Sequence, residues 1–422
     1  MKEVGKYLED IPKEMTIASD TDELKTKGRM IAALDVGTRV TCLIGTPEVQ
    51  SGKIRVLGGS SVACRGLKGG VVSDILEAAS AMTRAVEEAE ASAKATVSSV
   101  RLSVRGSHLQ SFNNRGAYNI ARADREITDD DVKAVGSAAR AIPMSADREI
   151  LHVVPQDFLL DHQRIVPHPL GMQTSLLEMN VHLVTVLSAH LKNTLKTVSQ
   201  AGFNVSGAVY GLLALGEMLL TPAMKERGVA LIDLGGKSIS LGVYYKGAIR
   251  HSRELPFGSD FITRDLAVGL KTSIATAEHI KQDYGIAHPS LFNGDADIEC
   301  LGIDAPIRVK TSDVMNIILP RVEEIFSTIA KDLQNTSYAD EVAPGGVVLT
   351  GGGSLLRGMA EVAQEHLDMP VHVGRAIQTR VVCDERWLSP IYTTALGLLS
   401  HSTGLSEIET TRLNARETTL PA

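Results

Sequence analysis

Two aspartates stand at matching places in the sequence where they could hold a metal ion beside a phosphate group. Asp35 and Asp233 each follow an apolar segment and precede a glycine-containing turn. A hydroxyl residue ends each turn, Thr38 in the first and Ser238 in the second. Glycine turns let backbone N–H groups approach phosphate oxygens closely. Aspartates at strand ends can hold the water shell that Mg²⁺ prefers to keep. The pattern predicts a clamp for phosphate and magnesium.

A third glycine-rich turn completes the pattern. Gly351, Gly352 and Gly353 stand between an apolar segment and an amphipathic one, which predicts a strand, a turn and a helix. Without Cβ atoms, this turn lets a flat group lie against the backbone. Each turn alone is a weak signal, because close packing explains it as well. All three in this order indicate a nucleotide-binding site.

The segments that carry the two aspartates indicate a duplicated core. Residues 30–45 read MIAALDVGTRVTCLIG, and residues 228–251 read GVALIDLGGKSISLGVYYKGAIRH. Each predicts a strand, a turn and a second strand, and residues 53–64 add a third strand to the first copy. A repeat of this length indicates two related halves. The alternation of strands and helices elsewhere predicts an α/β protein.

Apolar residues at helical spacing predict the helices that support these turns. Residues 73–95 predict a helix with Ser73 as its N-cap. The apolar stripe at 318–333 predicts another, with Pro320 in its first turn, where proline is tolerated. Further helices are predicted at 276–284 and 387–400.

Residues 99–182 look like a separate module. Strands are predicted at 99–106, 150–161 and 177–188. Thr128, followed by three aspartates, predicts the start of a helix with acids at the positive end of its dipole. This composition indicates a small α+β unit inserted into the first half.

The composition excludes several classes of protein. With 422 residues, 44% of them hydrophobic and 22% charged, the chain is expected to form two to four globular domains. The net charge of −7 predicts no general affinity for nucleic acid. Neither a spanning apolar segment nor a secretory signal is visible. Four scattered cysteines without a CxxC pair favour a reduced cytoplasm.

The order of the three turns resembles the actin–Hsp70–hexokinase superfamily of ATPases. Residues 34–38 are similar to its first phosphate motif, 232–238 to its second and 350–354 to its adenosine motif. Three residues near the C-terminal end of the core resemble its second connecting helix: Tyr392, Ala395 and Gly397.

Within that superfamily, the sequence resembles the FtsA family of bacterial cell-division proteins. The resemblance covers roughly residues 30–403 and rests on segments that sugar kinases and chaperones lack. These segments are RGLKGGVV at 65–72, SVRGSH at 103–108, ITDDDV at 127–132 and LHVVPQDF at 151–158. AEHIK at 277–281 resembles the helix of the family that meets the nucleoside.

The resemblance implies an α/β, two-lobed, actin-like ATPase fold with a duplicated core and an inserted α+β subdomain, 1C, of the SHS2 type. Lobe 1 would consist of subdomain 1A (30–98, 183–204 and a closing helix at 379–404) and the insert 1C at 99–182. Lobe 2 would consist of subdomain 2A (205–256 and 342–378) and subdomain 2B at 257–341. A polar extension at 1–29 and a polar tail at 405–422 would flank this core.

The resemblance also implies that ATP and Mg²⁺ bind between the lobes. Asp35 and Asp233 would hold the metal through water. The expected nucleotide-binding residues are Asp35, Gly37, Thr38, Asp233, Gly235, Gly236, Lys237, Ser238, Gly258, Glu278, Lys281, Gly351, Gly352 and Gly353. Asn193 is the candidate that would orient the attacking water. An amide is a poor base, so any hydrolysis is expected to be slow.

Several of these residues have a second interpretation. Lys237, which departs from the family's usual glycine, either reaches a phosphate or points to solvent. Glu278 and Lys281 either hold the ribose hydroxyls or form an exposed ion pair one helical turn apart. Asn193 either positions water or is an ordinary surface residue.

The function implied is that of an ATP-binding adaptor in cell division. Such a protein self-associates into filaments and binds the C-terminal peptide of the tubulin-like protein FtsZ on subdomain 2B. It links the Z-ring to the cytoplasmic face of the membrane at midcell and recruits later division proteins. The alternatives are an actin-like ATPase of pilus assembly and a small-molecule kinase of the same superfamily.

The membrane tether of the family is not visible in this sequence. SEIETTRLNARETTLPA at 406–422 has no Trp, Phe or basic stripe of the kind that binds a lipid surface. The 29 residues before the core are as often acidic as basic, so anionic lipid would attract them only weakly. Whether the chain binds membrane directly is left open by the sequence.

Overall fold

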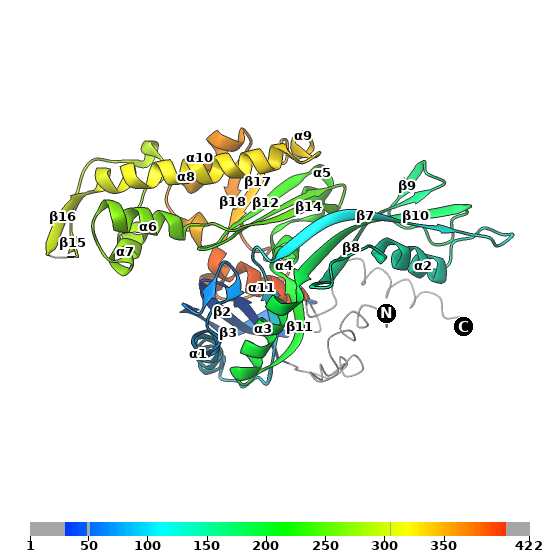
Figure 1. Cartoon of the computed structure of the whole chain (residues 1–422), viewed down its shortest axis with the longest axis horizontal. Coiled ribbons are helices and arrows are strands. Elements are labelled where there is room, and N and C mark those ends of the chain that lie inside the picture. The colour runs from blue at the N-terminus through cyan, green and yellow to red at the C-terminus, as the bar shows by residue number, and fades with distance from the viewer. Residues whose placement is uncertain (1–29, 49–50, 304, 402–422) are drawn as a thin grey trace. The chain divides into compact units, whose positions relative to one another are not determined.

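The computed structural model describes residues 30–48, 51–303 and 305–401 (Figure 1). The predicted extension at 1–29 and the predicted tail at 405–422 lie outside the described residues, as do residues 402–404 of the predicted closing segment. The chain divides into two compact units. Among the described residues, unit 1 holds those from 30 to 105, from 189 to 221 and from 374 to 401, and unit 2 holds those from 106 to 188 and from 222 to 373. Within the described ranges, no helix is long and apolar enough to cross a membrane.

A six-stranded sheet forms the centre of unit 1, in the order β11-β6-β1-β2-β3-β19. Its strands are β1 (Ile31–Val36), β2 (Arg39–Pro47), β3 (Ile54–Ala63), β6 (Ser99–Val104), β11 (Asn204–Tyr210) and β19 (Val381–Val382). β1, β2 and β3 form the predicted antiparallel meander. β6 pairs in parallel with β1, so the strand grouped with the inserted module from sequence alone belongs to this sheet. A short hairpin, β4 (Leu67–Lys68) and β5 (Val71–Val72), follows β3.

Two adjacent glycines in β3 show how helices cover both faces of this sheet. Successive residues of a strand point to opposite faces. A Cβ at Gly58 would collide with Ala93 at the end of α1 (Ile75–Ala93), whereas one at Gly59 would lie 3.3 Å from Trp387 on the other side. The Trp387 face is covered by α4 (Gly211–Leu219) and α11 (Thr393–His401). α3 (Ser188–Gln200) leads into β11.

Two predicted helix starts in unit 1 were wrong by a few residues. α1 is capped by Asp74 and not by Ser73, because the Asp74 carboxylate accepts a hydrogen bond from Glu77 N at 3.0 Å. The closing helix begins at Thr393 and not at 387. Short 3₁₀ turns at Glu385–Leu388 and Pro390–Tyr392 precede it, because Pro390 disfavours helix in the residue before it.

The sheet of unit 2 repeats that of unit 1, which confirms the predicted duplication. Its order is β14-β13-β12-β17-β18. Its strands are β12 (Val229–Leu234), β13 (Ile239–Tyr245), β14 (Ala248–Leu255), β17 (Val347–Thr350) and β18 (Val371–Val373). β12 pairs antiparallel with β13 and parallel with β17, as β1 does with β2 and β6. Asp35 and Asp233 are each the fifth residue of the corresponding strand.

Five helices contribute buried residues to one large apolar core at this second sheet. They are α6 (Asp260–Gly269), α7 (Ile274–Tyr284), α8 (Thr311–Gln334), α9 (Ala339–Val342) and α10 (Met359–Leu367), whereas the short α5 (Pro222–Arg227) has no buried residue. A hairpin of β15 (Asp297–Leu301) and β16 (Pro306–Lys310) lies at the end where α8 begins (Figure 1). A 3₁₀ turn at Pro289–Leu291 links α7 to this hairpin.

Pro320 is the tenth residue of α8, so its predicted place in the first turn was wrong. The helix starts earlier because the Asp313 carboxylate accepts a hydrogen bond from Lys310 N at 3.2 Å and so caps the N-terminus. The exposed side of α8 accommodates the proline ring. The predicted apolar stripe is confirmed, since Ile318, Val322 and Leu333 are all buried.

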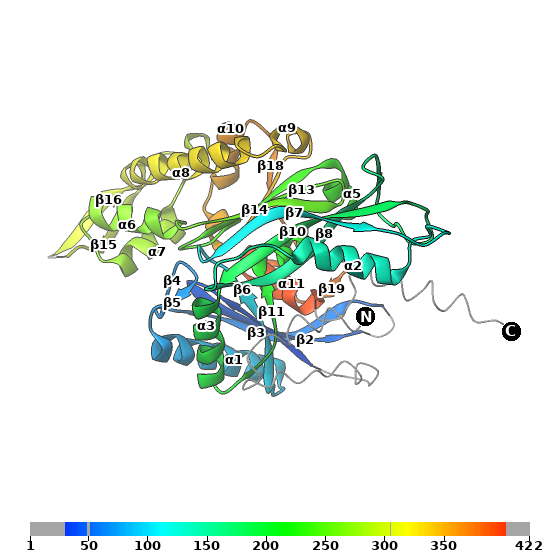
Figure 2. The ribbon, with the colours of Figure 1, turned by 45° about the vertical axis from the view of Figure 1, so that its right-hand side comes forward.

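The inserted module is a four-stranded sheet with a helix on one face (Figure 2). Its elements are β7 (Leu109–Asn119), α2 (Asp129–Arg140), β8 (Arg148–Leu160), β9 (Arg164–Val166) and β10 (Leu176–Leu187). The predicted capping at Thr128 is confirmed, because Thr128 N and Oγ1 both donate to the Asp131 carboxylate, at 2.8 and 2.7 Å. The module has an apolar core of its own.

Polar contacts hold the module against β14, an edge strand of the unit 2 sheet. Ser111 and Asn113 on β7 and Gln156 on β8 donate to backbone carbonyls of β14. Arg250 on β14 forms a two-point ion pair with Asp157 on β8, at 2.5 and 3.1 Å. The apolar cores of the module and of the sheet are separate clusters, and these hydrogen bonds and the Arg250–Asp157 ion pair bridge the two.

A buried histidine in this contact predicts loss of stability in acid. His182 lies 2.8 Å from both Asn113 Oδ1 and Ser252 Oγ, and burial, with the charge of His251, lowers its pKa to about 4. Between pH 6.5 and 4 the unfolded chain binds a proton that the folded chain does not. The free energy of unfolding should therefore decrease as the pH is lowered. At pH 4 it should be roughly 3 kcal/mol smaller than at neutral pH.

Urea unfolding as a function of pH checks this expectation. His182→Gln keeps an amide able to bond to both neighbours but removes the titration, so its pH slope should be shallower than that of the unsubstituted chain. His372→Gln, at an exposed position on β18, is the matched control and should leave the slope unchanged. Equal slopes for the His182 variant and the unsubstituted chain would contradict the assignment.

Candidate functional site

Unit 1 carries the first predicted phosphate turn, with Asp35 beside it. Gly37 and Thr38 form a two-residue turn between β1 and β2, and both are partly exposed. Asp35 is buried, and its Oδ1 accepts a hydrogen bond from Ser103 Oγ on β6. Arg105 Nη2 lies 3.3 Å from the same oxygen. The Asp35 carboxylate is therefore fixed by Ser103 on the neighbouring strand and by Arg105, the residue that directly follows this strand.

Unit 2 carries the second turn, and the third turn lies directly on it. Asp233 is buried at the end of β12, and Thr350 at the end of β17 pairs with it. Gly351 follows with φ +83°, a backbone conformation that favours glycine. A Cβ there would collide with Asp233 Oδ1 and lie 2.6 Å from Leu234 O. The backbone of the predicted adenosine turn therefore lies directly against the Asp233 carboxylate.

Gly258 brings a further segment onto the same turn. A Cβ at Gly258 would collide with Gly235 O and lie 2.7 Å from Gly236 O. Ser259 N donates to Gly235 O at 3.0 Å, and Asp260 N donates to Gly236 O at 2.8 Å. The first residues of α6 therefore hold the second phosphate turn in place, so Gly235, Gly236 and Gly258 form one cradle with Gly351 and Asp233.

Glu278 and Lys281 on α7 form an ion pair that also involves α6. Lys281 Nζ lies 2.7 Å from Glu278 Oε2 and 2.8 Å from Thr263 Oγ1. Lys281 is buried, so the pair is not the exposed one that the sequence allowed. Burial raises the pKa of the Glu278 carboxyl. The charge of Lys281 and the hydrogen bonds that Glu278 accepts outweigh burial, so the pKa of Glu278 is lowered overall.

Asp260 is a half-buried carboxyl among the cations of this region. Burial raises its pKa, and the charges of Lys281 and Lys237 oppose that rise. Lys237 is itself half-buried in the second turn. Ser238, the last residue of the turn, is buried.

The structure thus assembles the predicted residues in two groups, one in each unit. Asn193 belongs to neither group, because it lies on the exposed face of α3. Four contributing residues were not predicted: Ser103, Arg105, Asp260 and Thr263. Ser103 and Arg105 fall in the segment SVRGSH, whose alternation placed them on one strand face, but nothing in the sequence paired that strand with β1.

The carboxylate oxygens present at these two turns are of the type that binds Mg²⁺. Asp35 and Asp233 are carboxylates at strand ends, and Mg²⁺ binds such hard oxygen ligands, often through water. Each stands beside a turn in which glycine lets backbone approach a ligand. In unit 1, however, a guanidinium already lies against the aspartate.

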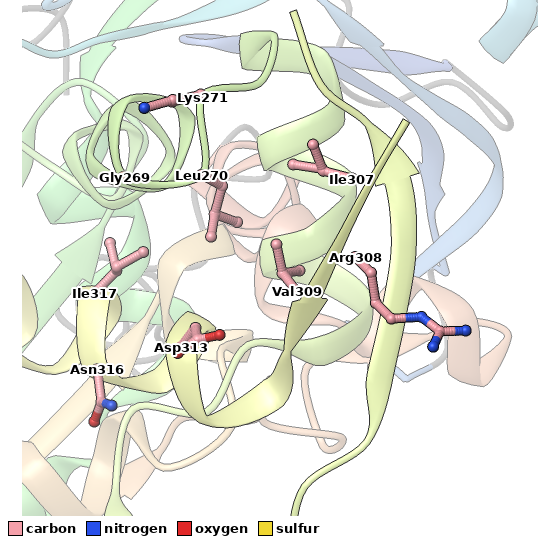
Figure 3. Close-up of a pocket in the computed structure, with 9 residues that line it drawn as sticks. All are labelled: Gly269, Leu270, Lys271, Ile307, Arg308, Val309, Asp313, Asn316 and Ile317. Carbon is pink, nitrogen blue, oxygen red and sulfur yellow. The ribbon is translucent and has the colours of Figure 1, made fainter. Parts of the chain in front are cut away.

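A separate hollow of about 510 Å³ lies in unit 2, between the end of α6, strand β16 and the start of α8 (Figure 3). Four of its nine lining residues are aliphatic, and of these Leu270, Val309 and Ile317 are directed toward one another. Lys271, Asp313 and Asn316 are at its margin. Arg308 extends away from the aliphatic walls and pairs with Glu299 at 2.9 Å (Figure 3).

Large aliphatic side chains remain exposed next to this hollow. Val268 and Ile274 flank the α6–α7 connection, and Leu301 and Ile303 flank the turn of the hairpin, with exposed fractions from 56% to 79%. Ile303 N donates to Lys271 O at 3.0 Å, which holds the two segments together. Adjoining exposed apolar residues of this kind mark binding surfaces more often than ordinary surface.

Solved structures with this arrangement are actin-like. The chain resembles the pilus protein in a structure of the PilM–PilN type IV pilus biogenesis complex, with a TM-score of 0.66, 16% identity and coverage of 88% of this chain and 98% of that one. It resembles ADP-bound MreB5 of Spiroplasma citri with a TM-score of 0.52 and 13% identity, over 92% and 100% of the two chains. The fold is therefore an actin-like, two-lobed α/β fold, as predicted.

Sequence comparison is more specific. Residues 230–397 match the family model described as cell division protein FtsA, and residues 106–185 match the SHS2 domain inserted in FtsA. The chain is 34% identical to FtsA of Pseudomonas aeruginosa, over 89% of each chain. It is 36% identical to FtsA of Neisseria meningitidis, over 89% of this chain and 91% of that one. The chain belongs to the FtsA family of cell division proteins.

Proposed function

We propose that the protein binds ATP with Mg²⁺ and acts as a self-associating, actin-like adaptor in cell division. The observation that carries this proposal is the cradle in unit 2, where Gly351 and Gly258 bring backbone against Asp233 and the turn at 235–238. Such contacts bring glycine backbone and a carboxylate close together, and a phosphate group with its metal needs both. Asp35 and the turn at Gly37–Thr38 would form the corresponding half in unit 1.

Magnesium would be held through water by Asp35 and Asp233, and it would neutralise charge on the phosphates. The residues of the chain would do the rest. Backbone of the three turns would bind phosphate oxygens. Glu278 and Lys281, fixed by Thr263, would contact the ribose.

Equilibrium binding of a fluorescent ATP analogue to the full chain tests this function. Saturable binding that unlabelled ATP displaces, with pelleting of assemblies that depends on the nucleotide, would support it. The absence of binding both with and without Mg²⁺ would overturn it. A turnover assay in the same samples would show whether hydrolysis is as slow as we expect.

We further propose that the hollow beside α8 receives the C-terminal peptide of FtsZ. Its aliphatic walls suit apolar side chains of a short peptide, and Lys271 at the margin suits a neighbouring carboxylate. The exposed aliphatic residues Val268 and Ile274 extend the same surface. Through this contact the protein would act at the cytoplasmic face of the membrane at midcell and recruit later division proteins.

Charge reversal at the margin of the hollow should weaken this contact. We expect Lys271→Glu to raise the Kd for the peptide at least about tenfold, because a like charge then faces the peptide carboxylate. Lys331→Glu is the same change at an exposed position near the other end of α8 and should have little effect. Fluorescence anisotropy with a labelled peptide measures both, and equal affinities would exclude the hollow as the peptide site.

A further inference from the structure

A buried cation lies beside the first aspartate and has no role in the function proposed so far. The side chain of Arg105 is 10% exposed, and that of Asp35 is 11% exposed. Arg105 Nη2 lies 3.3 Å from Asp35 Oδ1 and donates to Thr394 Oγ1 at 2.8 Å. Both charges are therefore largely removed from water, so each acts strongly on the other.

Three elements of unit 1 fix the guanidinium at this place. β6 pairs with β1, which sets Ser103 beside Asp35, and Arg105 directly follows the end of β6. Thr394 stands in the first turn of α11. Gly211, the first residue of α4, leaves the space that the guanidinium uses, since a Cβ there would lie 3.3 Å from Nη2. The guanidinium of Arg105 is thus held in place by packing against α4 and α11, and it is not a flexible surface side chain (Figure 1).

The electrostatic consequence concerns any anion that approaches the turn at Gly37–Thr38. A triphosphate near Asp35 meets a buried negative charge, and repulsion between the two is strong where water is scarce. A bound Mg²⁺ relieves such repulsion. A guanidinium against the carboxylate relieves it as well, and arginine keeps its charge at every physiological pH.

We propose that Arg105 is a positioning residue that neutralises Asp35 and so allows this lobe to accept a nucleoside phosphate even when Mg²⁺ is absent. The inference rests on the proposed function, because it requires that a nucleotide binds at the first turn. It predicts that the affinity of this chain for nucleotide depends only weakly on Mg²⁺. It also predicts that nucleotide binding becomes strongly dependent on Mg²⁺ when the guanidinium is removed.

The test measures the Kd of a fluorescent ATP analogue for the full chain, once with excess Mg²⁺ and once with EDTA. For the unsubstituted protein we expect less than about a tenfold difference between the two conditions. Arg105→Gln should raise that ratio by at least about tenfold, almost entirely through weaker binding in EDTA. Arg105→Lys, which keeps the charge, should have an intermediate ratio.

A double variant keeps the test valid if the single change disturbs folding. Arg105→Gln leaves Asp35 buried without its partner, which destabilises a fold, whereas Asp35→Asn together with Arg105→Gln removes both charges. For the double variant, the ratio of the Kd in EDTA to the Kd in Mg²⁺ should again be less than about tenfold. An unchanged ratio in both Arg105→Gln and Arg105→Lys would overturn the inference while leaving the proposed function intact. Failure of the unsubstituted protein to bind nucleotide in either buffer would instead remove the proposed function.

Discussion

Gly351→Ala is expected to abolish nucleotide binding and to lower the free energy of unfolding by about 2–4 kcal/mol. The backbone at Gly351 has φ +83°, which an alanine adopts only with strain. Its Cβ would collide with Asp233 Oδ1 and lie 2.6 Å from Leu234 O, and β12 is too deeply buried to move aside. Alanine therefore pushes the third turn away from the aspartate that it covers.

The next residue provides a matched control. A Cβ at Gly352 would meet no heavy atom within 4 Å, and Gly352 is exposed. Gly352→Ala should therefore change the free energy of unfolding by less than about 1 kcal/mol. Thermal unfolding and binding of the fluorescent ATP analogue measure both variants. If the two alanines behave alike, the close approach of Gly351 to Asp233 is not the basis of the cradle.

Asp157→Ala should be the most damaging single change in the contact between the inserted module and β14. It leaves the guanidinium of Arg250, whose side chain is 6% exposed, without its two-point partner. Loss of one member of a buried ion pair typically costs about 3–5 kcal/mol, because the remaining charge stays buried. We expect hydrogen exchange in β8 and β14 to rise by several orders of magnitude, as detected by mass spectrometry.

Two further variants separate a buried charge from a simple loss of contact. Asp157→Leu with Arg250→Met replaces both charges by apolar groups and should recover most of the lost protection. Glu299→Gln removes one partner of the exposed pair with Arg308 and should have almost no effect. If the double variant is no better than Asp157→Ala, the ion pair does not hold the module to β14.

Local patterns in the sequence predicted the hairpins around the turns and several of the helices, with the start of the closing helix misplaced by six residues. The repeat around Asp35 and Asp233 predicted two related hairpins, and five strands of the first sheet have the same order as the five strands of the second. The start of α1 was misplaced by one residue because serine and aspartate are both good N-caps, and only the hydrogen bond from Glu77 N distinguishes Asp74. Pro320 was misplaced because an exposed proline can be accommodated inside a long helix that is stabilised by its buried face.

The individual site residues were predictable, but their partners were not. Glycine, aspartate and hydroxyl residues in a fixed order indicate phosphate chemistry wherever they occur, so the three turns could be found from the sequence. Ser103 and Arg105 were not predicted as site residues. They reach Asp35 only because β6 pairs in parallel with β1, and more than 60 residues separate them from Asp35 in the sequence. No local preference encodes such a pairing.

For this protein, the sequence by itself determined the duplicated hairpins, the three glycine turns, the inserted module and the family. Only the tertiary structure decided that Gly258 and Gly351 meet at the turn after Asp233, that Arg105 lies against Asp35, and that polar groups attach the module to β14. The reason is physical. Periodicity and turn preferences act over a few neighbouring residues, whereas these contacts join segments that come together only when the sheets and helices pack.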